Sequence, residues 1–174
     1  KAFVQTQKDT HQAMEGFIHN LNTMHSRGGN QVVFSSINYG TDTSAEGRMV
    51  IEELLKATVE GLGTRGEVPV FPIQIFKIKN GVSYTEADYE KAMANFDAAM
   101  EGKLKFEAPN FDLFLKACHT TAKALFPNFM FLDAPFNAQY YKGTPETEIA
   151  YMGCRTRVMG NVYDPDREVT PGRG

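Results

Sequence analysis

The chain has 174 residues, of which 42% are hydrophobic and 22% charged, and its net charge is −3. These values are typical of one globular domain with a sizeable core, and they exclude a disordered or fibrous chain. The mildly acidic balance does not favour binding to nucleic acid or to membrane phosphates. The sequence also lacks an apolar run of the ~18 residues that span a bilayer, so we expect no membrane partner.

The hydrophobic pattern predicts regular elements that alternate between helices and strands. In chain order they are a helix at 9–27, a strand at 31–39, a helix at 43–60, an extended run at 68–78, helices at 85–100 and 112–126, a short strand at 129–132 and an extended run at 149–152. This order is typical of an α/β protein with crossover connections. Three or four strands make only a partial sheet, which would leave an edge uncovered.

Capping residues and breakers set the expected ends of these elements. Asp9 is the expected N-cap of the first helix, and Thr43 begins a sequence with the spacing of a capping box. Gly61 is expected to end the second helix. Pro69 and Pro72 interrupt the second extended run, so its first half is expected to be irregular or to lie at a sheet edge.

The ends of the chain and its cysteines bear on its cellular compartment and on whether it is part of a longer protein. The first eight residues are mostly polar and lack the apolar segment of a signal peptide. Two cysteines are too few for a disulfide framework or for an all-cysteine zinc site, which favours a reducing, cytoplasmic compartment. The first residue is not Met, and residues 171–174 form a turn-like stretch. We therefore expect a piece of a longer protein.

The four histidines do not predict a metal site. His11 and His19 lie eight residues apart, and His19 and His25 lie six apart, so no two imidazoles are side by side on one helix face. His25 differs in standing at the expected helix end, facing the following strand. No dinucleotide-binding, phosphate-binding-loop, zinc-protease or serine-hydrolase motif occurs.

The two cysteines differ in their local sequence. Cys118 stands within a predicted helix, where a small buried residue is expected. Cys154 follows Gly153 at the end of an extended run and precedes Arg155, so it is expected at a loop tip beside a cation that favours a reactive thiol. The alternative for Cys154 is a buried strand cysteine flanked by surface arginines.

The segment Met152-Gly153-Cys154-Arg155-Thr156 resembles the active-site segment of the anaerobic (class III) ribonucleoside-triphosphate reductases. Further segments match this family in the same order along about residues 10 to 174. They are 21–25, 29–34, 40–44, 57–63, 70–73, 123–128 and 172–174. Each segment is weak alone, and their order and spacing together are specific.

The resemblance implies roles for the residues around this segment. It places on Cys154 a transient thiyl radical that takes a hydrogen atom from the ribose 3′ carbon of the substrate. It places Met152, Gly153, Arg155, Thr156 and His25 in or near the substrate pocket. The protein would position the ribose and exclude water and other quenchers of the radical.

The resemblance also implies a fold, and it implies that several parts of the parent enzyme lie outside this chain. The family has a ten-stranded α/β barrel with a finger loop at its centre, shared with other glycyl-radical enzymes. Residues 1–174 would form part of this catalytic barrel domain, with 84–106 as a surface insertion. The second active-site cysteine, the glycyl-radical loop, a cysteine-rich metal site and a nucleotide-binding regulatory domain would lie elsewhere in the parent. The isolated chain is therefore expected to be inactive.

The implied partners belong to the parent enzyme. They are ribonucleoside triphosphates as substrate, nucleotide effectors, a radical-SAM activating enzyme that generates the glycyl radical, and a reductant such as formate or a thioredoxin-like protein. A homodimer is expected. Two alternatives stay open: another glycyl-radical enzyme with the same barrel, and a non-catalytic α/β binding module with an incidental exposed cysteine, which would fold alone without a large exposed apolar surface.

Overall fold

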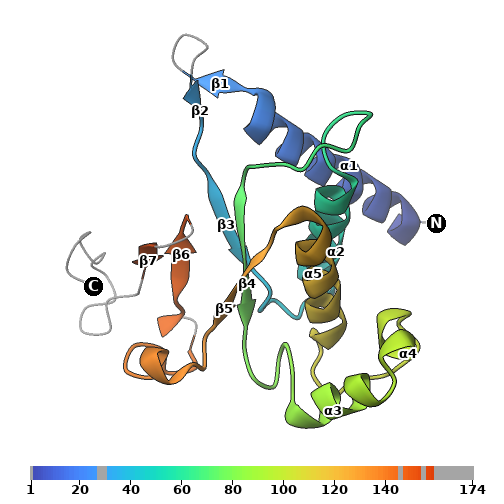
Figure 1. Cartoon of the computed structure of the whole chain (residues 1–174), viewed down its shortest axis with the longest axis vertical. Helices are drawn as coiled ribbons and strands as arrows, with labels where there is room; N and C mark the ends of the chain where they lie inside the picture. Colours follow the sequence, from blue (N-terminus) through green and yellow to red (C-terminus); the bar gives the residue numbers. More distant parts are fainter. Residues whose placement is uncertain (1, 27–30, 145–146, 154–155, 159–174) are drawn as a thin grey trace.

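The computed structural model describes residues 2–26, 31–144, 147–153 and 156–158 (Figure 1). The elements in chain order are α1 (Ala2–Thr23), β1 (His25–Ser26), β2 (Gln31–Val32), β3 (Ser36–Tyr39), α2 (Ala45–Glu60), β4 (Ile73–Ile78), α3 (Glu86–Ala94), α4 (Phe96–Met100), α5 (Phe111–Ala124), β5 (Asn128–Phe131), the 3-10 turn η1 (Pro135–Asn137), β6 (Ala150–Met152) and β7 (Thr156–Val158). Among these helices, none combines the length and the apolar character that crossing a membrane requires.

The centre of the molecule is a parallel sheet with the strand order β3-β4-β5. Its register places Ser36 opposite Ile73 and Ile75 opposite Asn128. Helix α2 connects β3 to β4, and α3, α4 and α5 lie between β4 and β5 in the chain. The predicted α/β architecture with crossover connections is therefore confirmed. The described residues form a small parallel sheet and not a closed barrel.

The two faces of this sheet carry different elements. Figure 1 shows α1, α2 and α5 on one side of the sheet and the β6–β7 hairpin on the other. The side chains of strand β4 point alternately toward the helices and toward the hairpin, because successive side chains of a strand lie on opposite faces of a sheet. Phe76 and Ile78 pack with Leu55 of α2 and Leu113 of α5, whereas Ile75 packs on the hairpin side.

A chain of buried polar groups runs through the helix-covered face. The Tyr39 hydroxyl donates to Gln74 Oε1 at 2.7 Å, and Gln74 Nε2 donates to Thr58 Oγ1 at 2.9 Å. Thr58 Oγ1 in turn donates to the carbonyl of Leu54 at 2.7 Å. Every polar group in this chain has a partner, which a buried polar group requires. Burial raises the pKa of Tyr39 well above its ordinary value of 10.0, because desolvation disfavours the phenolate.

The first helix differs from its prediction at both ends. It begins at Ala2, so Asp9 lies inside the helix, where it accepts a hydrogen bond from Gln5 at 2.8 Å instead of capping the N-terminus. Residues 2–8 contain no helix breaker, and the helix extends through them. At the other end it stops at Thr23, because His25 and Ser26 pair with 31–32 in a small antiparallel sheet.

The second helix ends at Glu60 before Gly61, as predicted. Its N-cap is Ser44 and not Thr43: the Ser44 hydroxyl oxygen accepts a hydrogen bond from the Gly47 amide at 3.0 Å. Asp42 fixes this start by accepting from the Ser44 amide at 2.8 Å. Hydrogen bonding from the Ser44 backbone, and then from its side chain, holds the pKa of Asp42 below its ordinary value.

Two further predicted elements are divided. The predicted strand 31–39 becomes β2 and β3, separated by residues 33–35, and the predicted helix 85–100 becomes α3 and α4, separated at Asn95. Asn95 has φ −146° and ψ 69°, which is not helical, and its side chain accepts from the Ala98 amide to cap α4. The irregular first half of the run 68–78 is confirmed, because β4 begins only at Ile73.

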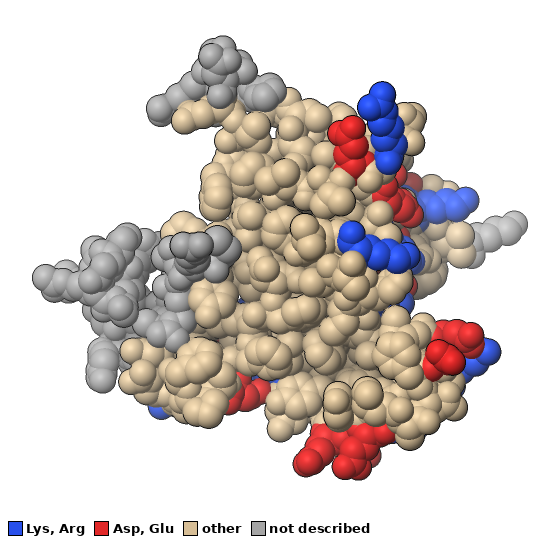
Figure 2. Space-filling view, viewed as in Figure 1, with Lys and Arg blue, Asp and Glu red and all other residues tan. Residues whose placement is uncertain are grey.

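The surface shown in Figure 2 carries its Lys, Arg, Asp and Glu side chains mainly toward the helices and the lower edge, and few at the centre of the view. Several large apolar side chains on the described surface are exposed, including Val33, Phe34, Val70, Phe131 and Met152. Exposed apolar side chains beside an open sheet edge agree with the expectation of a partial sheet.

Candidate active site

The strands on either side of Cys154 form an antiparallel hairpin. Met152, the last residue of β6, pairs with Thr156, the first residue of β7, and Tyr151 pairs with Arg157. Gly153 follows Met152 as the first residue of the connection, while Cys154 and Arg155 lie outside the described residues. The pairing of the flanking strands agrees with a hairpin loop at this point in the chain.

The side chain of Asn38 in β3 binds the backbone of strand β6. Its side-chain Nδ2 donates to the carbonyl of Tyr151 at 2.8 Å, and its Oδ1 accepts from the Tyr151 amide at 2.8 Å. The amide of Asn38 therefore satisfies both backbone groups of one residue, as a neighbouring strand would. Tyr151 lies three residues before Cys154, so this pair of bonds fixes the position of the hairpin on the sheet.

Ser36 and Phe34 fix the next position along the hairpin. The Gly153 amide donates to Ser36 Oγ at 3.1 Å. Gly153 is buried with φ +67°, and a Cβ at this residue would lie 3.0 Å from Cε1 of the Phe34 ring. The ring of Phe34 is held in turn by an edge contact with Phe71. A side chain at residue 153 would therefore strain the backbone and crowd the Phe34 ring, and glycine avoids both.

The start of strand β6 is anchored by charge. Lys77 of β4 forms an ion pair with Glu148, and the Thr41 hydroxyl donates to Glu148 Oε1 at 3.0 Å. The side chains of Lys77 and Glu148 are only 12% and 29% exposed, so solvent screens this pair less than an ordinary surface pair.

An apolar cluster completes the attachment of the hairpin. Ile149 packs with Ile75, Met130 and Leu132, and Tyr151 contacts the cluster. The strand before Cys154 is therefore joined to the sheet both by this cluster and by directed polar contacts.

The predicted pocket residues lie in different surroundings. The side chain of Met152 is 58% exposed, whereas Gly153 is buried. The backbone of Thr156 lies in β7, paired with Met152. The backbone of His25 lies in β1, which pairs with β2 in a separate small sheet that Figure 1 shows away from β6. The structure thus brings Met152, Gly153 and Thr156 into one hairpin and leaves the strand of His25 apart from it.

Cys118 differs from its prediction. It is exposed on α5 instead of buried, because the buried positions of this helix are others, including Leu113 and Ala117. Partial desolvation of its sulfur raises the pKa of the thiol above the ordinary value. At neutral pH this cysteine is therefore mostly protonated, which is unfavourable for a nucleophile.

The anchoring residues Phe34, Ser36, Asn38, Lys77 and Glu148 were not among the predicted site residues. The signal for two of them is present in the sequence. Ser36 and Asn38 are polar and alternate along a strand whose other residues are Ile37 and Tyr39. A strand with one polar face beside an apolar one indicates that the polar face meets something other than the core.

Comparisons with known proteins place the chain in a family. The model of the family described as anaerobic ribonucleoside-triphosphate reductase matches residues 1–174. The anaerobic ribonucleoside-triphosphate reductase of Haemophilus influenzae is 27% identical over 173 residues, which are 99% of this chain and 20% of that protein. The enzyme of the same name from Enterobacteria phage T4 is 26% identical over 97% of this chain and 24% of its own length.

The enzyme of the same name from Escherichia coli K12 is 26% identical over 87% of this chain. The chain thus spans between 18% and 24% of the length of these relatives. Because the family match extends over every residue, the chain belongs to the anaerobic ribonucleoside-triphosphate reductase family, as the resemblance predicted.

Proposed function

We propose that this chain forms part of the catalytic domain of an enzyme that reduces ribonucleoside triphosphates to deoxyribonucleoside triphosphates. The observation that carries this proposal is the family match over residues 1–174, which includes the hairpin around Cys154. The docking of that hairpin on the polar face of β3 supports it, because radical chemistry needs a reacting sulfur held in one place.

In the proposed reaction, the sulfur of Cys154 takes a hydrogen atom from the ribose 3′ carbon, so an S–H bond forms as a C–H bond breaks. The 2′ hydroxyl then leaves as water after protonation. Two electrons and a proton come from formate or from a thioredoxin-like dithiol, and the S–H group finally returns its hydrogen to the 3′ carbon. A glycyl radical in another segment of the parent, made by a radical-SAM activating enzyme, would supply the unpaired electron.

The described residues would position and shield this chemistry. Asn38 and Ser36 hold the backbone of Tyr151 and of Gly153, so the strand that leads to Cys154 has a fixed place on the sheet. Helices cover one face of the sheet and the hairpin lies on the other. This arrangement supports a ten-stranded barrel with the helices outside and the hairpin inside, where water would be excluded.

The remaining partners follow from the same proposal. Nucleotide effectors would regulate the parent enzyme, two copies would form a homodimer, and the enzyme would act in the cytoplasm. Met152, Gly153, Arg155 and Thr156 would contribute to the substrate pocket from the hairpin, and His25 would do so from the separate strand β1. The exposed side chain of Met152, next to the buried Gly153, supports a place for Met152 at the pocket surface.

The test uses the full-length enzyme, activated without oxygen and supplied with a ribonucleoside triphosphate. We expect deoxyribonucleotide product, and slower turnover when the ribose 3′ hydrogen is replaced by deuterium. A strong glycyl-radical signal in electron paramagnetic resonance without any deoxyribonucleotide would indicate another glycyl-radical substrate. Absence of both signal and product, with a chain that folds alone as a compact monomer, would favour the binding module.

A further inference from the structure

The turn that follows strand β3 is bound by two distant parts of the chain at the carboxyl end of this strand. It consists of Gly40, Thr41 and Asp42 and leads from β3 toward α2. The side-chain Nδ2 of Asn110, the N-cap residue of α5, donates to the carbonyls of Gly40 and Asp42, each at 2.9 Å. The hydroxyl of Thr41, between them, donates to Glu148 Oε1 at 3.0 Å. The turn 40–42 therefore links the start of α5 to the residue two positions before β6.

Asn110 does not cap its own helix. An asparagine at the N-cap normally accepts a hydrogen bond from an amide two or three residues later, and no such bond forms within the described residues of α5. Its Oδ1 accepts instead from Arg48 Nη1 at 2.6 Å, and its Nδ2 makes two bonds to the turn. The residue is completely buried, with 0% of its surface exposed. Its side chain therefore serves the turn 40–42 and not α5.

Arg48 of α2 and the backbone fix the orientation of the Asn110 side chain. The guanidinium of Arg48 donates to the carbonyl of Pro109 and, at 2.8 and 3.0 Å, to the carboxylate oxygens of Asp112. The backbone amide of Asn110 donates to the carbonyl of Val82 at 2.8 Å. Because a guanidinium only donates and a carbonyl only accepts, Oδ1 must face Arg48 and Nδ2 must face the turn. The side chain of Asn110 is thus held in the one orientation that binds the turn.

The turn also lies directly against strand β4. Gly40 has φ +119°, and a Cβ at this residue would lie 2.6 Å from the carbonyl oxygen of Lys77. A residue with a side chain would therefore push the turn away from β4, and glycine permits the close approach. The side chain of Lys77 forms the ion pair with Glu148, to which Thr41 also donates. Movement of the turn would therefore disturb both groups that hold Glu148.

We propose that Asn110 is a positioning residue for the Cys154 hairpin, acting through the turn 40–42. Strand β6 is held before its first residue at Glu148 and after its last residue at Gly153. Without the Asn110 side chain the turn loses the group that binds its two carbonyls, and the holding point at Glu148 is weakened. The consequence for catalysis rests on the proposed function of Cys154, whereas the effect on the backbone of β6 does not.

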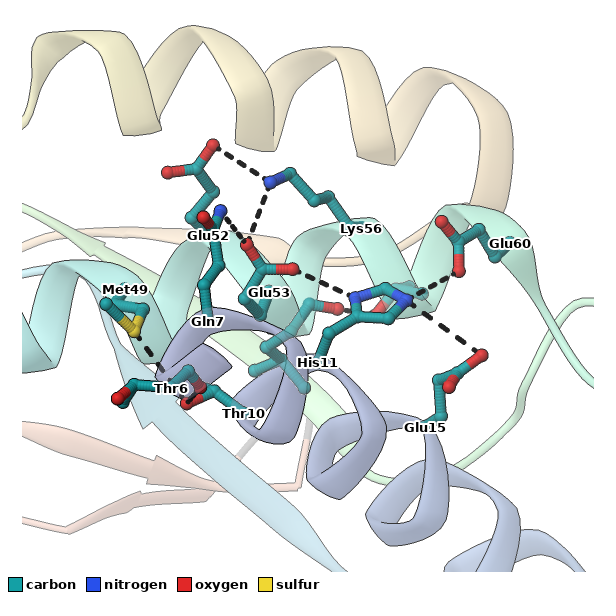
Figure 3. A network of polar contacts seen from close by, with 12 residues as sticks. Thr6, Gln7, Thr10, His11, Glu15, Met49, Glu52, Glu53, Lys56 and Glu60 are labelled. Atoms are coloured by element: carbon teal, nitrogen blue, oxygen red, sulfur yellow. Dashed lines mark hydrogen bonds and ion pairs between the residues drawn. The ribbon is translucent and has the colours of Figure 1, made fainter. Parts of the chain in front are cut away.

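A buried polar group between α1 and α2 provides the matched control. Figure 3 shows Glu53 of α2, whose Oε1 accepts from Gln7 and Lys56, each at 2.8 Å, and whose Oε2 lies 2.9 Å from His11 Nδ1. The Glu53 side chain is only 3% exposed, so it resembles Asn110 in burial and in having three polar partners. These three partners belong to α1 and α2 and not to the turn or to the hairpin. Loss of Glu53 therefore tests a change in stability alone.

The test is hydrogen–deuterium exchange of the Tyr151 and Gly153 amides in the full-length enzyme, together with steady-state kinetics. We expect Asn110→Ala to exchange these amides at least ~10-fold faster than wild type, because β6 opens locally more often. Its kcat per folded molecule should fall by about 10-fold, with the KM for the ribonucleoside triphosphate unchanged. Glu53→Ala should lose stability and keep wild-type exchange and kcat. Wild-type exchange at both amides in Asn110→Ala would overturn the proposal, whatever its turnover.

Two substitutions of Thr41 test the link between the turn and Glu148. Thr41→Val keeps the size of the side chain and removes its hydroxyl, whereas Thr41→Ser keeps the hydroxyl. The expected result is faster exchange and lower kcat in Thr41→Val, and values near wild type in Thr41→Ser. Thr41 is only half-buried, so this pair decides the question where Asn110→Ala fails to fold. Equal exchange rates in the two Thr41 variants would also overturn the proposal.

The exchange rates separate this proposal from the proposed function. Wild-type enzyme that makes no deoxyribonucleotide would contradict the proposed function alone, because the exchange of the β6 amides does not depend on activity.

Discussion

The two faces of the small parallel sheet are built by different interactions. On the helix-covered face, Phe76 and Ile78 pack with apolar side chains of α2 and α5. On the hairpin face, the Asn38 amide and the Ser36 hydroxyl bind backbone atoms of β6 and Gly153. Apolar packing has no preferred direction, whereas hydrogen bonds fix particular atoms at particular distances. Each face also contains the other kind of contact, a polar chain through Gln74 under the helices and an apolar cluster around Ile149 under the hairpin. Only the hairpin face, however, uses side chains of β3 to hold backbone atoms of Tyr151 and Gly153 in place.

The difference is visible within a single strand. Ile37 and Tyr39 of β3 pack against an apolar cluster of α1 and α2 that consists of Ile18, Leu54 and Ala57. The alternate residues of β3, Ser36 and Asn38, hold the hairpin. Substitutions on the hairpin face should therefore lower catalysis beyond their effect on stability. Substitutions on the helix face should lower stability alone.

The largest effect is expected from Gly153→Ala. The added methyl group meets the Phe34 ring at 3.0 Å, and the residue must keep φ +67°. Displacement of the neighbouring Cys154 loop by about 1 Å should lower kcat by about 100-fold in the full-length enzyme.

Gly63→Ala is the matched control for Gly153→Ala, because it has a similar φ of +62° and nothing within 4 Å of the new methyl group. It should lose some stability and keep its turnover. Equal losses of turnover in both alanine variants would show that backbone strain, and not the contact with Phe34, causes the effect.

The next effect is expected from Asn38→Ala, which removes both bonds to the Tyr151 backbone. The two half-buried groups lose their partners, so the free energy of unfolding should fall by about 1–3 kcal/mol. Because the hairpin loses its fixed position, turnover per folded molecule should fall by about 10-fold. Urea unfolding and steady-state kinetics measure the two quantities.

Asp88 of α3 offers a matched control away from the hairpin. Its Oδ1 and Oδ2 accept from the amides of Glu107 and Ala108, each at 2.8 Å. Asp88→Ala should be destabilised at least as much as Asn38→Ala while keeping its turnover per folded molecule. A loss of turnover as large as that of Asn38→Ala would contradict the special role of the hairpin contacts.

The smallest effect on catalysis is expected from Tyr39→Phe, on the helix face. Removal of the hydroxyl leaves Gln74 Oε1 without its donor, which should cost about 1–3 kcal/mol of stability with no change in turnover. Chemical denaturation and the activity assay at neutral pH test this pair of outcomes.

The difference in stability between wild type and Tyr39→Phe should depend on pH. The pKa of Tyr39 is raised in the folded protein, so above pH ~10 the unfolded chain loses this proton first and stability falls as pH rises. Below pH ~10 the raised pKa adds no pH dependence. Wild type should therefore lose more stability than Tyr39→Phe between about pH 9 and pH 11. Parallel stability curves for the two proteins over this interval would contradict the effect of burial on Tyr39.

Local patterns in the sequence predicted the order of helices and strands. The stop at Gly61 and the irregular residues before β4 follow from residues that act on their immediate neighbours. The early start of α1 was missed because Phe3 and Val4 in its first turn are not followed by apolar residues at helical spacing, although Gln7 reaches Glu53 of α2. The break at Asn95 was missed because the apolar spacing continues through it.

The attachment of the hairpin could not be predicted from local patterns. Asn38 and Tyr151 are 113 residues apart, and nothing near either residue specifies the other. Likewise, the spacing between histidines gives no information about the contact of His11 with Glu60, which lies 49 residues away on α2. Contacts of this kind depend on the packed fold. The alternation of the polar residues Ser36 and Asn38 along β3 is the one local pattern that indicates the contact with the hairpin.

We propose that the reacting sulfur is that of Cys154, in the β6–β7 hairpin. The most direct measurement compares Cys154→Ala with Cys118→Ala in the full-length enzyme, activated without oxygen. We predict that Cys154→Ala keeps its glycyl-radical signal and makes no deoxyribonucleotide, and that Cys118→Ala, altered at an exposed position of α5, makes product as wild type does. Product from Cys154→Ala at the wild-type rate would contradict the account.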